Sequence, residues 1–334
     1  MTIRVMMNAM VLEHPGRLLV YKKMAVPIPS DRQVLIKVSA CGICRTDLHI
    51  IDGELKKPKL PLVPGHEIIG RVVSIGKNVT TLKINDLVGV PWLGYTCGYC
   101  KFCKRGEENL CDNAEFTGYT IDGGFSEYTV ADALFCLPLT ARFARPESAP
   151  LLCAGLIGYR CYSMISTGAK NIGIYGFGSA AHIITQIAKA QEKQIFAFTR
   201  EGNIDSQLFA LKMGADWAGS VSELPPEKLD AAIIFAPAGE LIPQALAALD
   251  KRGEVVCGGI HMSDVPAFSY QLLWGERSVK SVANITRQDG KDFFDILNRV
   301  PVHTQTQVFH LQQANEAISK LRHSSIQGAA VLVM

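Results

Sequence analysis

Four cysteines gather in one short stretch of this 334-residue chain, and their spacing suits a metal ion. Cys97, Cys100 and Cys103 follow one another at intervals of three residues, and Cys111 comes eight residues later. Four thiolates so spaced can surround one tetrahedral Zn²⁺ at Zn–S distances of about 2.3 Å, and metal binding then folds the loop. Disulfides or an iron–sulfur cluster are the alternatives. We recognise no signal peptide and no Cys-Pro at the end of the run, so we predict a structural zinc in a reducing, cytoplasmic location.

A second set of potential ligands is scattered along the chain. Cys44 lies in GICRTDLH, His66 in PGHE and Cys153 in LLCAG. A lone buried cysteine is more often part of a core than a ligand. Together, however, two thiolates and one imidazole match the three protein ligands of a catalytic zinc whose fourth position stays open. The sequence alone does not show whether the three side chains converge.

A glycine-rich turn indicates a dinucleotide. Gly176-Phe-Gly178-Ser179-Ala-Ala181 follows an apolar run and precedes a helical pattern. The first glycine suits the tight turn, the second allows close approach of a pyrophosphate, and Ala181 allows the helix to pack closely on the strand. A glycine turn without a ligand is the alternative, but the expected strand–turn–helix context favours a nicotinamide or flavin dinucleotide.

The end of the next expected strand bears on the choice of cofactor. An NAD site normally places Asp or Glu there to bind the ribose hydroxyls, whereas this chain has Thr199 followed by Arg200. A hydroxyl and a guanidinium suit a 2′-phosphate, which a carboxylate would repel. Glu201 is one residue further and could turn inward, and Arg200 could be a solvated loop residue. We favour NADP over NAD.

The elements that must position these residues change character near Pro146. Before it, runs rich in β-branched residues predict short strands at 33–40, 67–75, 86–91 and 125–130. After a helix-compatible run at 147–166, strands alternate with helices. We expect strands at 172–175, 194–199, 231–235 and 254–257, helices at 180–191, 205–213 and 242–249, and a tail with a helix at 312–321 and a strand at 329–333. This predicts an α/β chain with a barrel-like β unit and a parallel sheet with crossover helices.

Composition excludes several classes of protein. The chain has 48% hydrophobic and 19% charged residues, which is typical of a compact globular protein. Its net charge of +3 comes from 34 basic and 31 acidic residues with no basic cluster, so we expect no nucleic-acid partner. No apolar run is long enough for a transmembrane helix, so we expect no membrane partner. Most cysteines outside the metal sets should be buried thiols that serve packing.

The motifs together resemble one family. Cys44-Arg-Thr-Asp, Gly65-His-Glu67, the four-cysteine lobe, Cys153-Ala-Gly and Gly176-Phe-Gly-Ser-Ala-Ala181 are similar to those of the zinc-dependent medium-chain dehydrogenase/reductase family, close to bacterial alcohol dehydrogenases. The resemblance covers essentially the whole chain. It implies a GroES-like β-barrel-type catalytic domain at 1–148 and 285–334, with the zinc lobe at about 92–115, and a Rossmann doubly wound domain at 149–284.

The resemblance also implies roles for individual residues. Cys44, His66 and Cys153 would bind catalytic zinc, with Glu67 as a neighbouring or alternate ligand and Asp47 orienting His66. Thr46 would pass the alcohol proton through the nicotinamide ribose to His49. Helix capping by Thr46 and a surface position for His49 are the alternatives. The other implied contacts are Arg45 on the cofactor pyrophosphate, Trp92 in the substrate pocket and His261 at most at its rim.

Departures from the family pattern concern the cofactor rather than the metals. Many relatives have a threonine where this chain has Ile157, and some have a basic residue near the position of Ala329. Asn85 replaces a glycine before a strand, and because Asn tolerates positive φ we expect the turn to be retained.

We therefore predict a zinc-dependent alcohol dehydrogenase with two Zn²⁺ per chain, acting on a small primary or secondary alcohol. It would transfer hydride reversibly between the alcohol and NAD(P)⁺, with zinc as the Lewis acid that lowers the pKa of the alcohol. The alternatives are an NADPH-dependent aldehyde or cinnamyl-type reductase and a non-catalytic, dinucleotide-binding redox sensor. The family suggests a homodimer or homotetramer.

Overall fold

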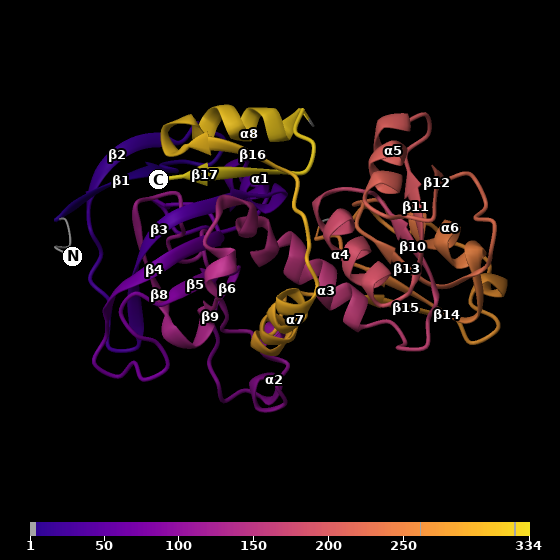
Figure 1. Ribbon diagram of the computed structural model, residues 1–334, viewed down its shortest axis with the longest axis horizontal. Coiled ribbons are helices and arrows are strands. Elements are labelled where there is room, and N and C mark those ends of the chain that lie inside the picture. Colours follow the sequence, from indigo (N-terminus) through magenta and orange to yellow (C-terminus); the bar gives the residue numbers. More distant parts are fainter. Residues whose placement is uncertain (1–4, 261, 324) are drawn as a thin grey trace. The chain divides into compact units, whose positions relative to one another are not determined.

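The computed structural model describes residues 5–260, 262–323 and 325–334, so His261 lies outside the described residues (Figure 1). The chain divides into two compact units. Unit 1 contains Met1–Ala154, Asn284–Phe294 and Thr304–Met334, and unit 2 contains Gly155–Ala283 and Asp295–His303. Among the helices of the described residues, none is both long and apolar enough to cross a membrane.

Unit 1 is built on a seven-stranded sheet around the long strand β3 (Gln33–Ile43). The strand order is β16-β17-β3-β4-β5-β9, and β8 also pairs with β3. Register shifts between Leu35 and Ile36 and between Val38 and Ala40 mark irregularities of the kind that bend a strand. Residues at alternate positions of β3 point to one face of the sheet, and Val34, Ile36 and Val38 are buried there in a continuous apolar core. The other strands are β1 (Met6–Val11), β2 (Val20–Ala25), β4 (Glu67–Ile75), β5 (Leu87–Val90), β6 (Leu93–Tyr95), β7 (Glu115–Phe116), β8 (Tyr128–Asp132), β9 (Leu137–Pro138), β16 (Thr306–His310) and β17 (Ala329–Val333).

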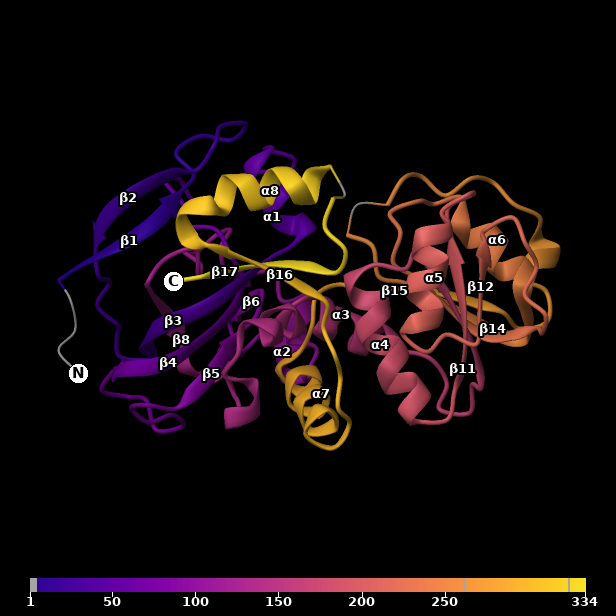
Figure 2. The ribbon, with the colours of Figure 1, turned by 45° about the horizontal axis from the view of Figure 1, so that its top comes forward.

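Several helices accompany this sheet in unit 1. The two that matter most for the site are α1 (Arg45–Ile51), which continues from β3, and α8 (Ala314–Arg322), which contacts it. Both views show α8 beside β16 and β17 (Figure 2). Unit 1 also contains α2 (Lys101–Lys104), most of α7 (Arg287–Arg299), whose last residues belong to unit 2, and several 3-10 helices, of which the longest is Pro146–Leu152.

Unit 2 is a doubly wound parallel sheet with the order β12-β11-β10-β13-β14-β15. The strand order reverses between β10 and β13, which is the place where such sheets bind ligands. Its strands are β10 (Asn171–Tyr175), β11 (Gln194–Thr199), β12 (Trp217–Ser220), β13 (Leu229–Ile234), β14 (Leu249–Cys257) and β15 (Ser278–Ser281). Its helices are α3 (Ala154–Ser163), α4 (Ser179–Ala190), α5 (Ile204–Lys212) and α6 (Leu241–Ala248).

The predicted fold class is confirmed, and most predicted elements are present within two or three residues. One prediction needs correction: the run at 147–166 is not one helix. A 3-10 helix containing Pro150 ends at Leu152, Cys153 has φ −128° and ψ −71°, and α3 begins only at Ala154. Proline removes a backbone donor and prevents a regular α-helix there. The elements that were not predicted are the strands β1, β2, β6, β7, β9, β12, β15 and β16 and the helices α1, α2 and α7.

Candidate metal centres and dinucleotide loop

The start of α1 holds the first candidate ligand. Cys44 is the N-cap, and its Sγ accepts a hydrogen bond from the Thr46 backbone N–H at 3.2 Å. The Cys44 N–H in turn donates to Asp47 Oδ2 at 2.9 Å. A sulfur at a helix N-terminus receives backbone donors and the positive end of the helix dipole, both of which favour the thiolate.

His66 and Glu67 come from the start of β4, opposite the end of β3. Both are buried, and Asp47 Oδ1 lies 3.3 Å from His66 Nδ1, which leaves Nε2 facing Cys44. Gly42 pairs with Glu67 across the two strands, and a Cβ at Gly42 would lie 1.8 Å from Glu67 Oε2. Any larger residue at this position would therefore force the Glu67 carboxylate to move from the place it occupies here.

Cys153, at the end of the 3-10 helix, completes the cluster. Its Sγ lies 3.8 Å from Cys44 Sγ, and Cys44 Sγ lies 3.1 Å from His66 Nε2. Sulfurs bound to one tetrahedral zinc at about 2.3 Å are about 3.8 Å apart, so the two thiols have the separation that zinc requires. One ligand atom from each of these residues and from Glu67 lies within 4.8 Å of the others.

Three side chains of this cluster have pKa values far from their usual ones. A hydrogen bond from Cys153, supported by His66, holds the pKa of Cys44 well below that of a free thiol despite burial. Burial would lower the pKa of His66, but the charges of Cys44 and Asp47 outweigh it and raise that pKa. Burial, with Cys44 nearby, raises the pKa of Glu67 well above its usual value. Within the described part of the chain, Glu67 Oε2 has no hydrogen-bond partner. A buried carboxylate oxygen without a donor and a polarised thiol fit a bound cation.

Trp92 lies against this cluster. Its ring meets the His66 ring edge-on at a centroid distance of 5.0 Å. Phe116 and Tyr119 stack on Trp92 at centroid distances of 5.1 and 5.7 Å, so three aromatic rings form a wall beside the candidate metal ligands. Phe116 and Tyr119 were not predicted from the sequence, because nothing in their spacing distinguishes them from ordinary core aromatics.

The second thiol cluster is a separate lobe of unit 1. Cys97 Sγ lies 3.9 Å from Cys103 Sγ and 3.5 Å from Cys111 Sγ, and Cys100 belongs to the same group. Burial would raise the pKa of Cys97, but backbone N–H groups and neighbouring thiols lower it to about 7. No disulfide joins cysteines in the described residues, and the sulfur separations fit one tetrahedral zinc.

Two contacts tie this lobe to the rest of unit 1. The Glu108 carboxylate accepts hydrogen bonds from Arg287 N at 3.1 Å and from Arg287 Nε at 3.0 Å. Asn284 donates its side-chain amide to the Asn109 carbonyl. The described part of the lobe contains the one-turn helix α2, a 3-10 helix at Glu108–Leu110 and short strands, so a bound metal would add to these contacts in holding its shape.

The glycine-rich turn of unit 2 lies between β10 and α4. Gly176 has φ +88°, and Gly178 is the N-cap of α4. Apart from its chain neighbours, no described residue has an atom within 4 Å of a Cβ built on Gly178. Ser179 is the first residue of α4 and Ala181 is fully buried. The backbone at the helix N-terminus is therefore open to an anion, as a pyrophosphate site requires.

At the end of β11, the hydroxyl of Thr199 is directed into the protein. Thr199 is buried, and its Oγ1 lies within hydrogen-bond distance of the Gly219 carbonyl and of the Gln207 amide. Arg200 is exposed. The Glu201 carboxylate accepts hydrogen bonds from the hydroxyls of Ser220 and Ser222, the latter at 2.7 Å.

Thr46 and His49, the two residues of the expected proton relay, both lie on α1. Thr46 is buried, His49 lies one turn later, and Arg45 is exposed at the first position of the helix. Residues three apart face the same side of a helix, so Thr46 and His49 lie on one side of α1.

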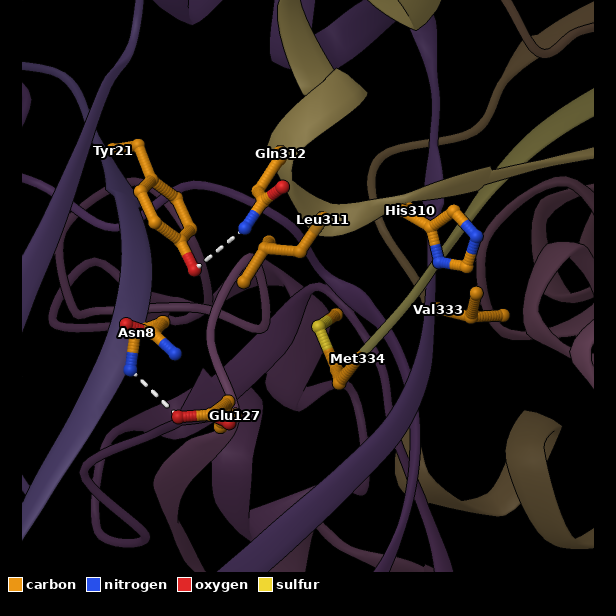
Figure 3. Close-up of a pocket in the computed structure, with 8 residues that line it drawn as sticks. All are labelled: Asn8, Tyr21, Glu127, His310, Leu311, Gln312, Val333 and Met334. Carbon is orange, nitrogen blue, oxygen red and sulfur yellow. Dashed lines mark hydrogen bonds between the residues drawn. The ribbon is translucent and has the colours of Figure 1, made fainter.

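A pocket of about 180 Å³ opens elsewhere on unit 1 (Figure 3). Tyr21 Oη accepts a hydrogen bond from Gln312 at 3.1 Å, and Asn8 N–H donates to Glu127 at 2.7 Å. None of its lining residues belongs to either candidate metal cluster. These bonds attach the β1–β2 hairpin to the sheet.

Comparison with known proteins places the chain in a family. Residues 30–141 match the alcohol dehydrogenase GroES-like domain. A probable alcohol dehydrogenase (AdhA) of Mycobacterium tuberculosis is 42% identical over 92% of this chain and 91% of its own length. An alcohol dehydrogenase of Geobacillus stearothermophilus is 33% identical over 98% of both chains. The structure of a cinnamyl alcohol dehydrogenase from Sorghum bicolor superposes with a TM-score of 0.88, at 27% identity over 98% of this chain and 97% of that one. The chain therefore belongs to the zinc-dependent medium-chain dehydrogenase/reductase family, among its alcohol dehydrogenases.

Proposed function

We propose that this alcohol dehydrogenase holds its catalytic zinc with Cys44, His66 and Cys153 and oxidises primary or secondary alcohols with NAD(P)⁺. The observation that carries the proposal is the convergence of these ligands from distant segments, with the two sulfurs 3.8 Å apart. In this proposal unit 1 binds the alcohol, unit 2 binds the dinucleotide, and a second zinc holds the lobe of Cys97, Cys100, Cys103 and Cys111.

A zinc ion in the first cluster supplies Lewis acidity, which lowers the pKa of an alcohol hydroxyl. In this proposal Thr46 Oγ1 accepts the proton of that hydroxyl while its own proton moves on, and His49, one helical turn further on, takes up the transferred proton at its imidazole. In this proposal Asp47 holds His66 with Nε2 toward the metal. Loss of such a partner by mutation commonly lowers metal affinity or activity by about 10–100-fold.

Glu67 and Trp92 define two sides of the proposed site. The buried Glu67 carboxylate is close enough to the ligand atoms to serve as an alternate ligand when no alcohol is bound. Trp92, stacked on Phe116 and Tyr119, gives an apolar wall that suits the carbon chain of an alcohol.

For the cofactor, the end of β11 supports NADP over NAD. Two serine hydroxyls bind the Glu201 carboxylate, and Arg200 is the exposed cation of the same turn. A guanidinium is the group that proteins use for bidentate binding of a phosphate. We expect Arg200→Gln to weaken NADPH binding about tenfold while changing NADH binding little, in titrations followed by the fluorescence of the reduced cofactor. Equal weakening of both would contradict the proposal.

The function is tested by steady-state rates with short aliphatic, aromatic and secondary alcohols and with each nicotinamide cofactor. Cys44→Ser should abolish alcohol oxidation and leave dinucleotide binding nearly intact. Cys136→Ser is the matched control, because Cys136 is a buried thiol outside both clusters whose Sγ contacts the Asp132 carbonyl at 3.5 Å. Retention of activity in Cys44→Ser, or equal losses in the two variants, would contradict the assignment.

A cinnamyl-type aldehyde reductase is the second candidate. The aromatic wall and the likeness to the sorghum cinnamyl alcohol dehydrogenase favour it. We would compare kcat/KM for aromatic aldehydes with NADPH to kcat/KM for the corresponding alcohols with NADP⁺. A higher value for the aldehydes would support aldehyde reduction as the main direction. Dinucleotide binding without turnover of any alcohol or aldehyde would instead indicate a redox sensor. Homodimer or homotetramer formation stays a prediction that light scattering can test.

A further inference from the structure

The end of α1 folds back over His49. Gly53 follows the helix with φ +78°, and its N–H donates to the Ile50 carbonyl at 3.2 Å. The next N–H, of Glu54, donates to the His49 carbonyl at 2.9 Å. These two bonds define a Schellman motif, which brings the residue after the glycine back to the last turn of the helix. Glycine at position 53 permits the left-handed conformation that the motif requires.

This backbone motif places the Glu54 carboxylate on the His49 ring. His49 Nδ1 and Glu54 Oε2 form a hydrogen bond. The same two positions of a Schellman motif often make an apolar contact, whereas here they form a carboxylate–imidazole pair. The Glu54 side chain is 56% exposed and that of His49 is 23% exposed, so the pair lies at the protein surface.

A neighbouring ion pair fixes the helix end by a separate route. Arg322 of α8 donates from both Nη atoms to the two carboxylate oxygens of Asp52, each at 2.8 Å. Asp52 therefore anchors the end of α1 to α8, whereas Glu54, two residues later, contacts the histidine. The two acidic residues differ in their hydrogen-bond partners, Arg322 for Asp52 and His49 for Glu54. Separate substitutions can therefore distinguish their effects on the His49 ring.

We infer that Glu54 is a positioning residue that selects the tautomer of His49. This inference rests on the proposed role of His49 as a proton acceptor. With the proton of the neutral ring on Nδ1 and directed at Glu54, Nε2 carries the lone pair. A proton released from the alcohol then adds to Nε2 and forms the imidazolium, which keeps its hydrogen bond to Glu54, and a proton later leaves to water.

The test is nitrogen NMR of the histidine side chains in the zinc-loaded enzyme, with the His49 signals assigned by their loss in His49→Gln. We expect the Nδ1–H tautomer in the wild type and in Glu54→Gln, because the glutamine oxygen still accepts the hydrogen bond. Glu54→Ala should shift His49 toward Nε2–H. Asp52→Asn is the matched control, since it removes a nearby carboxylate charge without touching the ring, and should keep the wild-type tautomer.

Steady-state kinetics on the same variants supply the second readout. We expect Glu54→Ala to lower kcat for alcohol oxidation about tenfold with little change in the alcohol KM, and Glu54→Gln to recover most of that loss. A wild-type tautomer in Glu54→Ala, or an equal tautomer shift in Asp52→Asn, overturns the inference. A shifted tautomer with unchanged kcat also overturns it. An unchanged kcat in His49→Gln contradicts instead the proposed role of His49.

Discussion

At the scale of single residues, the candidate catalytic site depends on a glycine that makes room for a carboxylate. Gly42 and Glu67 face each other on β3 and β4, and a Cβ on Gly42 would overlap the carboxylate. Asp47 has a comparable supporting role, since it receives the Cys44 N–H with one oxygen and faces His66 with the other. The ligands are thus held by neighbours as much as by their own backbone.

We expect Gly42→Ala to lower the free energy of unfolding by about 1–3 kcal/mol, the usual cost of overpacking. In a Glu67→Ala background the cost of Gly42→Ala should fall by at least half, because the overlapping carboxylate is gone. Urea unfolding of the four proteins in this double-mutant cycle measures the coupling. Gly168→Ala is the control, because the nearest described atom to a Cβ built there would be Ser166 Oγ at 3.8 Å, an ordinary contact. Additive costs at 42 and 67 would contradict the steric explanation.

The ligand types could be predicted from the sequence, but their supports could not. Cys44, His66 and Cys153 belong to recognisable motifs, and the structure brings their ligand atoms together. The role of Gly42 depends on the register of β3 against β4, and that of Glu54 depends on the backbone motif after α1. Neither the register nor the motif can be read from the type of a single residue. Asn85, by contrast, was predicted to keep a turn with positive φ, and its φ of +74° confirms this.

At the scale of elements, one aspartate links three parts of unit 2. Asp216, just before β12, accepts hydrogen bonds from Lys189 of α4 at 2.7 Å and from Ile195 N of β11 at 2.7 Å. Burial would raise the pKa of Asp216, but these donors outweigh it and lower the pKa. The stabilisation is therefore complete above the unfolded-state pKa of about 4 and is lost as pH falls through the lower, folded-state value.

We expect Asp216→Asn to cost about 1–2 kcal/mol at neutral pH, a value kept low because the side chain is 38% exposed. The difference from wild type should shrink as pH falls from about 5 to about 3, where the wild-type carboxyl becomes protonated. Urea unfolding across this range measures it, and Lys189→Met should behave alike. A difference independent of pH would mean that the charge of Asp216 is not involved.

The cysteine lobe is an element whose stability we attribute to metal. Cys103→Ser should remove one zinc per chain and lower the melting temperature by roughly 10 °C, since the metal replaces a hydrophobic core in this lobe. Alcohol oxidation by the remaining folded enzyme should persist, because no ligand of the first cluster changes. Melting temperatures and rates of alcohol oxidation, measured for Cys103→Ser and for the control Cys136→Ser, test both expectations. Loss of all activity with both zinc ions retained would contradict the separation of the two clusters.

At the scale of the whole molecule, the alternation of strands and helices after Pro146 correctly predicted a parallel sheet. The edge strand β15 was missed because its sequence, SVKS, has a single exposed apolar residue, Val279. The helix α7 was missed although a signal was present. Thr286 and Asp289 exchange backbone and side-chain hydrogen bonds as a capping box, and this pattern stands just before buried Phe293.

The central claim is that two separate clusters of this chain each hold one zinc, with Cys44 in the catalytic one. Zinc content per folded chain, measured by mass spectrometry after exhaustive dialysis, tests it most directly. We predict two zinc ions per chain in the wild type and one in Cys44→Ser, with dinucleotide binding unchanged. A wild-type protein with a single zinc, or a Cys44→Ser protein that still holds two, would contradict the claim.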